Sequence, residues 1–175
     1  MPRSTLLIFV VSVFLSTSEV PVVAQSPESW LEKALALDKN GFWDEAVETW
    51  EKLATTDINS KLAVYARLKL GTTYQKLGKF QQSIDTAKAT VQLHPNNFDA
   101  HFHLANSLSA LRRFSEAVEA YEKTTILKPE EGLGYVGQGL SLFGNGNSKK
   151  AIEVLLKANI LFKNKSTCGF LVTIS

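Results

Sequence analysis

A 34-residue period constrains the fold of this chain more than any other feature of its sequence. The small residues Ser83, Ala117 and Ala151 follow one another at that interval, and each precedes a β-branched apolar residue. An equivalent stretch around Ala46 lies 37 residues before Ser83, because three extra residues, 61–63, fall between the units. A chain with such a period folds as a stack of similar units, since one unit alone cannot bury its apolar face.

Each unit has the pattern of two helices joined by a tight turn. Apolar residues recur at helical spacing, as in Val47, Trp50 and Leu53. The turn carries a glycine in three of the units, Gly41, Gly78 and Gly146. Glycine tolerates the positive φ that ends a helix, and Pro95 and Pro129 stop the second helix of their units. We therefore predict eight helices and no strand.

These positions resemble the tetratricopeptide repeat family, whose unit is a 34-residue helix–turn–helix. In that numbering the units are residues 27–60, 64–97, 98–131 and 132–165, the last of them degenerate. Position 8 holds Ala34, Gly71, Ala105 and Gly139, and position 20 holds Ala46, Ser83, Ala117 and Ala151. Small residues there let two helices approach closely. The resemblance implies an all-α fold, a right-handed superhelical solenoid of stacked repeats.

The first residues have the pattern of a secretory signal peptide. Arg3 precedes the apolar run 6–15, and small residues stand before a cleavage site that would remove residues 1–24. Glu19 and Pro21 interrupt the run well short of the ~20 apolar residues that span a bilayer. We therefore expect an exported protein, in a periplasm, a lumen or the extracellular space, with no stable membrane span. The alternative is an uncleaved segment that anchors the protein to a membrane.

Composition excludes several classes of protein. Hydrophobic residues make up 45% of the 175 residues and the net charge is +2, so we expect neither disorder nor nucleic-acid binding. The one cysteine, Cys168, cannot form an intramolecular disulfide. Charge alternates along the chain instead. The net charge is −4 over residues 27–63, +4 over 64–97, −2 over 98–131 and +4 over 132–175.

The resemblance places a candidate binding surface on the concave side of the solenoid, where positions 2, 5, 9 and 12 of each first helix form the wall. The peptide-groove residues that it implies are Tyr65, Leu68, Thr72, Gln75, Asp99, Phe102, Asn106, Ser109, Val136 and Leu140. We expect Thr72, Gln75 and Asn106 to hydrogen-bond a peptide backbone. In the fourth unit the wall is wholly apolar and includes Leu133 and Phe143. We expect it to pack against a following helix that is absent from this sequence, since such patches are rarely left exposed.

The sequence offers no pattern typical of a catalytic, cofactor or metal site. His101 and His103 lie two residues apart on a predicted helix, so they face different directions and cannot share a metal. The glycine-rich stretch 144–148 lacks the lysine and the preceding strand of a phosphate loop. Family members that clamp the terminal carboxylate of heat-shock chaperones use cationic and amide side chains where this chain has Leu31 and Leu35. We expect neither enzymatic activity nor that clamp.

We expect a non-catalytic protein–protein interaction scaffold or assembly adaptor that binds a peptide or a helix in the concave groove. An alternative is a truncated regulatory or targeting repeat region of a larger enzyme or multidomain protein. A third is self-association through the fourth repeat. The tail 166–175 is short and uncharged, whereas repeat arrays normally end in a polar capping helix. Either a longer parent chain or a partner would cover that end.

Overall fold

The computed structural model describes residues 26–57 and 60–171, with side chains to residue 164, and these ranges contain eight α-helices and no strand. The helices are α1 (Pro27–Asn40), α2 (Trp43–Thr56), α3 (Lys61–Lys76), α4 (Phe80–Leu93), α5 (Phe98–Ala110), α6 (Phe114–Leu127), α7 (Gly132–Gly144) and α8 (Ser148–Leu171). The predicted all-α fold is confirmed. The predicted signal peptide, residues 1–24, lies outside the described residues.

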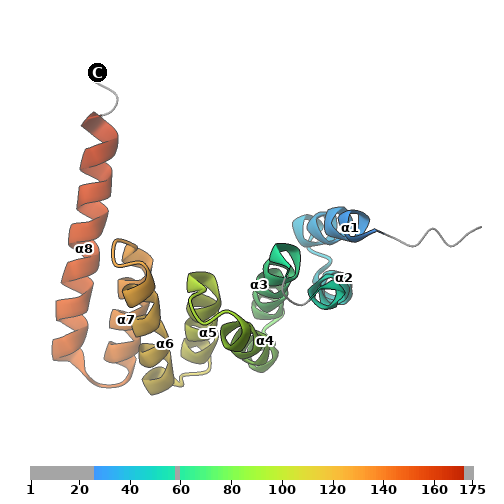
Figure 1. Cartoon of the computed structure of the whole chain (residues 1–175). Coiled ribbons are helices and arrows are strands. Elements are labelled where there is room, and N and C mark those ends of the chain that lie inside the picture. Colours follow the sequence, from blue (N-terminus) through green and yellow to red (C-terminus); the bar gives the residue numbers. More distant parts are fainter. Residues whose placement is uncertain (1–25, 58–59, 172–175) are drawn as a thin grey trace, which may run out of the picture.

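Successive helices form hairpins that stack side by side into an arc (Figure 1). Each helix packs against the next one along the chain, and α5 also contacts α3 and α7 directly. The first helices of the units, α1, α3, α5 and α7, therefore line the concave side, and α2, α4 and α6 form the outer side. α8 stands at the end of the arc (Figure 1). The chain is a helical solenoid of stacked helix–turn–helix units, as predicted.

Local sequence signals set the helix boundaries. Ser26 caps α1 by accepting a hydrogen bond from the backbone N–H of Ser29 at 3.3 Å. The turn glycines take left-handed φ values, 81° at Gly41, 70° at Gly78 and 82° at Gly146. In the third unit Arg112 occupies the same turn position with φ 59°. This arginine holds a conformation that costs a residue with a Cβ roughly 1–2 kcal/mol.

α8 is longer than the other helices and continues to Leu171, past the end of the predicted fourth unit at residue 165. In the second and third units a proline stands just beyond the second helix, Pro95 after α4 and Pro129 after α6. Lys163 occupies that position in the fourth unit. The absence of a proline there permits the helix to continue, and α8 includes residues 166–171 of the predicted tail.

The core lies between the paired helices, where small residues permit close packing. Ala34 and Ala46 of the first unit are fully buried, as are Ala105 and Ala117 of the third. The largest fully buried side chain is Trp50 of α2. Close approach of the helices and burial of large apolar side chains beside them stabilise each unit.

α7 carries glycines where neighbouring side chains lie directly against its backbone. A Cβ on Gly134 would lie 2.5 Å from Oγ1 of Thr124, and one on Gly139 would lie 2.6 Å from Cγ of Leu155. Gly137 faces the ring of Tyr121 in the same way. Each glycine costs about 1 kcal/mol relative to alanine in a helix interior. That loss is offset by the close contact of α6 and α8 with α7.

Candidate functional site

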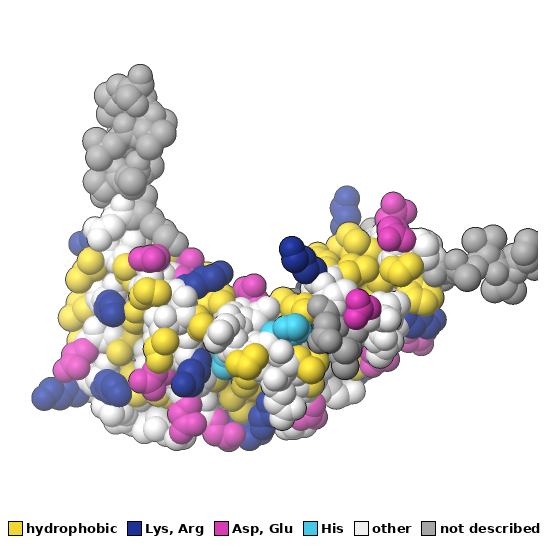
Figure 2. Space-filling view, in the orientation of Figure 1, with side chains coloured by type: hydrophobic (Ala, Val, Ile, Leu, Met, Phe, Trp, Pro, Cys, Tyr) yellow, Lys and Arg dark blue, Asp and Glu magenta, His cyan; other side chains and the backbone are white. Residues whose placement is uncertain are grey.

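The predicted groove residues lie on the concave side of the arc, on α3, α5 and α7. The space-filling view shows this side hollowed between α8 and α1 (Figure 2). Tyr65 is 39% exposed, Leu140 is 58% exposed, and Asp99 is also exposed. The other predicted residues are half-buried, namely Leu68, Thr72, Gln75, Phe102, Asn106, Ser109 and Val136. One face therefore gathers the candidate residues of three units.

A pocket of about 300 Å³ opens on this face between α3 and α5. Its lining is Tyr65, Leu68, Lys69, Thr72, Asp99 and His103. Four of these residues were predicted, whereas Lys69 and His103 were not assigned to the groove. Both occupy position 6 of their units, directly after position 5 of the groove wall. Including position 6 in the predicted wall would have identified them. An apolar floor with polar groups converging from two helices is typical of a binding pocket.

His103 is the buried titratable group of this pocket. Its Nδ1 atom is buried without a hydrogen-bond partner among the described residues. Burial lowers the pKa of His103, and the nearby Asp99 carboxylate only partly opposes that shift. Lys69 extends over the ring of Tyr65, with Nζ 5.5 Å from the ring centre. The neutral imidazole therefore forms part of the pocket wall, with its unsatisfied Nδ1 closed off from solvent.

Gln75, predicted to contact a peptide, joins two units of the solenoid. Its Nε2 atom donates to Oγ of Ser107 at 2.7 Å and to the carbonyl oxygen of His103 at 3.1 Å. Both acceptors lie on α5, whereas Gln75 lies on α3. The side chain thus uses both amide protons in the contact between the second and third units. Its predicted contact with a peptide backbone stays a prediction, in which the side-chain carbonyl oxygen would accept.

Thr72 and Asn106 also have internal partners. Thr72 Oγ1 donates to the carbonyl oxygen of Leu68 at 2.9 Å, and Asn106 Oδ1 accepts from the hydroxyl of Tyr121. Of the polar groups of Thr72 and Asn106, the amide nitrogen of Asn106 is the donor that these two hydrogen bonds do not use. Phe102 lies beside it, with its ring centre 6.0 Å from that of Tyr121 in an edge-to-face arrangement. The third unit therefore offers a rigid aromatic surface with one amide group.

The fourth unit contributes an exposed apolar patch to the same face. Its members are Leu133, Leu140 and Phe143, which are 52%, 58% and 66% exposed. No helix of the described residues covers this wall, because α8 packs on the other side of α7, and the following helix that we expect to cover it stays a prediction. The groove thus changes along its length, from a polar pocket at α3 and α5 to an apolar patch at α7.

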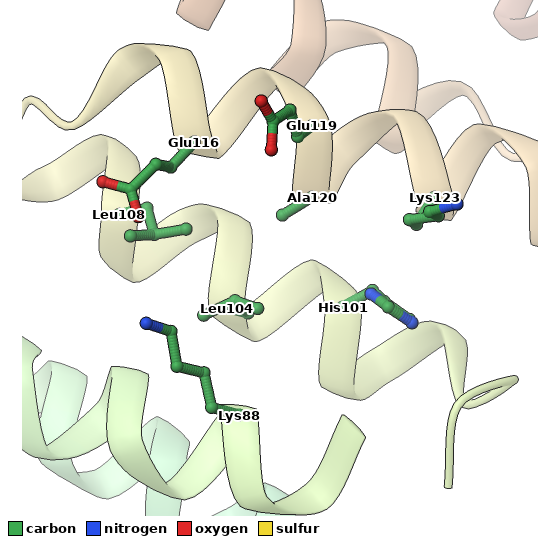
Figure 3. Close-up of a pocket in the computed structure, with 8 residues that line it drawn as sticks. All are labelled: Lys88, His101, Leu104, Leu108, Glu116, Glu119, Ala120 and Lys123. Atoms are coloured by element: carbon green, nitrogen blue, oxygen red, sulfur yellow. The ribbon is translucent and has the colours of Figure 1, made fainter. Parts of the chain in front are cut away.

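A second pocket, of about 250 Å³, lies on the outer side between α4 and α6 and was missed from the sequence. Figure 3 shows Lys88 reaching up from α4, Leu104 and Leu108 on α5 between it and α6, and Glu116, Glu119 and Lys123 above on α6. His101 and Leu108 in its lining are smaller than their counterparts one unit earlier, Arg67 and Tyr74. Arg67 donates to the carbonyl oxygen of Ala54 at 2.9 Å, and Tyr74 donates to Glu51 at 2.8 Å.

Two further features of the described residues bear on function. No cluster of three histidine, cysteine or acidic side chains that could hold a metal occurs in residues 26–57 and 60–164. Likewise, none of the helices in the described part of the chain combines the length and apolar character needed to cross a bilayer.

The family follows from a comparison with known repeats. The model of the tetratricopeptide repeat matches three overlapping stretches, residues 31–97, 68–124 and 103–162. The chain belongs to the tetratricopeptide repeat family. Among solved structures, a crystal structure of MamA is similar over most of its length. It has 25% identity and a TM-score of 0.74, and the similarity covers 82% of each chain.

Two curated relatives match more locally. The peroxisomal targeting signal receptor of Kluyveromyces lactis is 32% identical over 92 residues, which are 53% of this chain and 16% of the receptor. The auxiliary subunit of the N-terminal acetyltransferase A complex of Arabidopsis thaliana is 25% identical over 123 residues, 70% of this chain and 13% of that subunit. This tetratricopeptide repeat chain therefore spans only a small part of the length of these relatives.

Proposed function

We propose that this tetratricopeptide repeat protein is a scaffold or assembly adaptor that binds an extended segment or a helix of a partner protein in its concave groove. One observation supports this proposal most strongly. The concave face holds both the exposed apolar side chains of the fourth unit and the pocket between the second and third units. Large exposed apolar groups bordered by polar ones mark an interaction surface. No step of this function requires chemistry from the scaffold.

The two ends of the groove favour different contacts with the partner. The pocket between α3 and α5 is large enough for one side chain and offers the imidazole of His103 and the ammonium group of Lys69. The patch on α7 offers aliphatic and aromatic contact through Leu140 and Phe143. A partner with an apolar stretch at one end and a polar side chain at the other suits both.

The comparisons support a binding role. One relative is named a receptor for a targeting signal and the other an auxiliary subunit of an enzyme complex. Both descriptions concern proteins that act through other proteins. They also support the alternative that this chain is a regulatory or targeting part of a larger assembly with an enzyme, because it matches only 13% of the auxiliary subunit.

The groove proposal is tested by recovery of a partner from the source organism. Wild type is compared with a variant that carries Tyr65→Ala and Leu140→Ser, two exposed positions at opposite ends of the groove. The matched control carries Glu48→Ala and Gln82→Ala, two exposed positions on the outer helices. We expect the groove variant to lose the partner and the outer variant to keep it. Equal recovery with both variants would contradict binding in the groove.

Export is a second part of the proposal. It rests on the charged start, the apolar run 6–15 and the small residues before the predicted cleavage site after residue 24. The test is mass spectrometry of the N-terminus in fractions of the source cell. We expect a mature protein that begins at Gln25 outside the cytoplasm. An intact N-terminus in the cytoplasmic fraction contradicts export, and an intact N-terminus in the membrane fraction indicates an anchor.

A further inference from the structure

The outer face of α8 carries a row of exposed apolar side chains, here called the α8 stripe. Its members are Ile152, Leu156 and Ile160, which are 60%, 57% and 57% exposed. Spaced four residues apart, they share one side of the helix. Figure 2 shows hydrophobic side chains over α8 with lysine side chains among them. Large aliphatic side chains exposed in a contiguous row are typical of a contact surface.

A further repeat stacked after α8 would cover only part of the α8 stripe. It would cover Ile152, whose counterpart Ile84 is fully buried, but not Ile160, whose counterpart Ile126 is 64% exposed. The residues equivalent to Leu156 in the other units are Glu51, Lys88 and Glu122, and all three are exposed. They lie on α2, α4 and α6, each of which already has a following helix packed against it. This position therefore faces solvent even where the stack continues. Leu156 replaces a charged residue on the outer surface, so its partner comes from outside the solenoid.

The charges around the α8 stripe indicate the chemistry of that partner. Lys149 lies three residues before Ile152, and Lys163 lies three residues after Ile160, so a lysine stands at each end of the row. The described side chains of α8 include four lysines, Lys149, Lys150, Lys157 and Lys163, and one acid, Glu153. A complementary surface has an apolar centre with carboxylates at both ends.

A second copy of the chain does not supply such a surface. Antiparallel pairing of two α8 helices centred on Leu156 would place Lys149 opposite Lys163, and parallel pairing would place each lysine opposite itself. The strongly acidic helix α2 exposes no large apolar side chain. A lipid surface is also disfavoured, because an interfacial helix needs a broad apolar face, whereas much of the apolar surface of α8, such as Leu155, packs against α7.

We propose that the α8 stripe is a second partner-binding surface, separate from the concave groove, which takes an acidic amphipathic helix of another protein. The apolar side of that helix packs against Ile152, Leu156 and Ile160, and its acidic side chains lie near Lys149 and Lys163. Packing of aliphatic side chains supplies affinity, and the lysines select acidic partners over basic ones. This surface functions whether or not the groove binds a peptide.

The test uses two synthetic helical peptides as probes and the full chain. Both peptides have three leucines at four-residue spacing; one has a glutamate three residues beyond each end of the row, and the other has lysines there. Fluorescence anisotropy measures binding to the wild type and to Leu156→Glu, a residue that the first and third units carry at this position. We expect the acidic peptide to bind roughly tenfold tighter than the basic one, and Leu156→Glu to weaken it roughly tenfold or more. The control Glu122→Ala keeps wild-type affinity.

Charge reversal gives a stricter readout. A variant with Lys149→Glu and Lys163→Glu should prefer the basic peptide, provided that its circular dichroism matches the wild type. Equal affinity of the wild type for both peptides overturns the proposal. Loss of binding in the variant with Tyr65→Ala and Leu140→Ser, but not in Leu156→Glu, places the peptide in the groove and also overturns it. A third result would also overturn the proposal: neither peptide binds, but the chain binds phosphatidylserine vesicles, or self-associates in sedimentation, and Leu156→Glu abolishes that binding.

Discussion

The side-chain amide of Gln75 donates to the hydroxyl of Ser107 at 2.7 Å and thereby joins the second unit to the third. Ser107 in turn donates to the carbonyl oxygen of His103 at 3.0 Å. Its one proton is therefore used, so Ser83, 2.8 Å away, must donate to it. Both serine side chains are fully buried. A polar network thus crosses the contact between two units directly beneath the concave groove.

Removing Gln75 from this network should destabilise the solenoid. We expect Gln75→Leu to lower the free energy of unfolding by about 1–2 kcal/mol, because Ser107 and the His103 carbonyl each lose one of their two side-chain donors. Thermal denaturation followed by circular dichroism checks this. Gln82→Leu on the exposed side of α4 is the matched control and should change stability by less than about 0.5 kcal/mol. Equal effects of the two variants would show that the network contributes nothing.

Arg112 should be replaceable by glycine with a gain in stability. Its φ of 59° is the conformation that glycine supplies at the same turn position in the other three units. Relief of the left-handed strain outweighs the extra freedom of an unfolded glycine, so we expect Arg112→Gly to stabilise the chain by about 0.5–1 kcal/mol. The melting temperature should rise by a few degrees. Gly78→Arg, the reverse change one unit earlier, should lower it.

Gly137→Ala should destabilise the chain although alanine is the better helix former. Helix propensity alone favours alanine by about 1 kcal/mol, but the added methyl group would collide with the ring of Tyr121. We expect a net loss of about 1–3 kcal/mol in denaturant unfolding. The loss should shrink in a Tyr121→Leu background, since the ring is then gone. Stabilisation by Gly137→Ala would mean that the contact is loose.

Stability should fall in mild acid through His103. Burial lowers the pKa of this imidazole in the folded state, whereas the unfolded chain has the ordinary value of about 6.5. The contribution of the neutral imidazole to folding stability is therefore fully present when the pH is above the pKa of the unfolded chain. It is lost as the pH falls through the lower pKa of the folded state. We expect the melting temperature to drop less between pH 7 and pH 5 in His103→Gln than in the wild type. An identical drop in both proteins contradicts a shifted pKa.

The sequence predicted the fold because its information is local and repeated. Small residues such as Ala34 and Ala46 mark where helices touch, and a glycine such as Gly41 marks where one helix turns into the next. The end of α8 was not predicted to lie at Leu171, because the family pattern stops at residue 165. Lys163, in place of the usual proline, permits a longer helix but does not by itself predict one, since α2 ends at Thr56 without a proline after it.

The site was predicted only in part, because a position on a face does not reveal what a side chain is bonded to. Tyr65 and Leu140 lie on the concave side as the family pattern indicates, and both are exposed. Gln75 lies there too, yet its hydrogen bonds depend on how α5 packs against α3, which no spacing encodes. The pocket on the outer side is likewise lined by side chains of α4, α5 and α6, and the spacing within one helix does not reveal it.

Site-specific photo-crosslinking tests the central claim, groove binding, most directly. A benzophenone amino acid is placed in turn at Tyr65 and Leu140 in the groove, and at Glu48 and Gln82 on the outer helices, in the full chain within its source cells. We expect the two groove positions to give a crosslinked species of the same mass and the outer positions to give none of that mass. The same species from the outer positions, with none from the groove, would contradict the account.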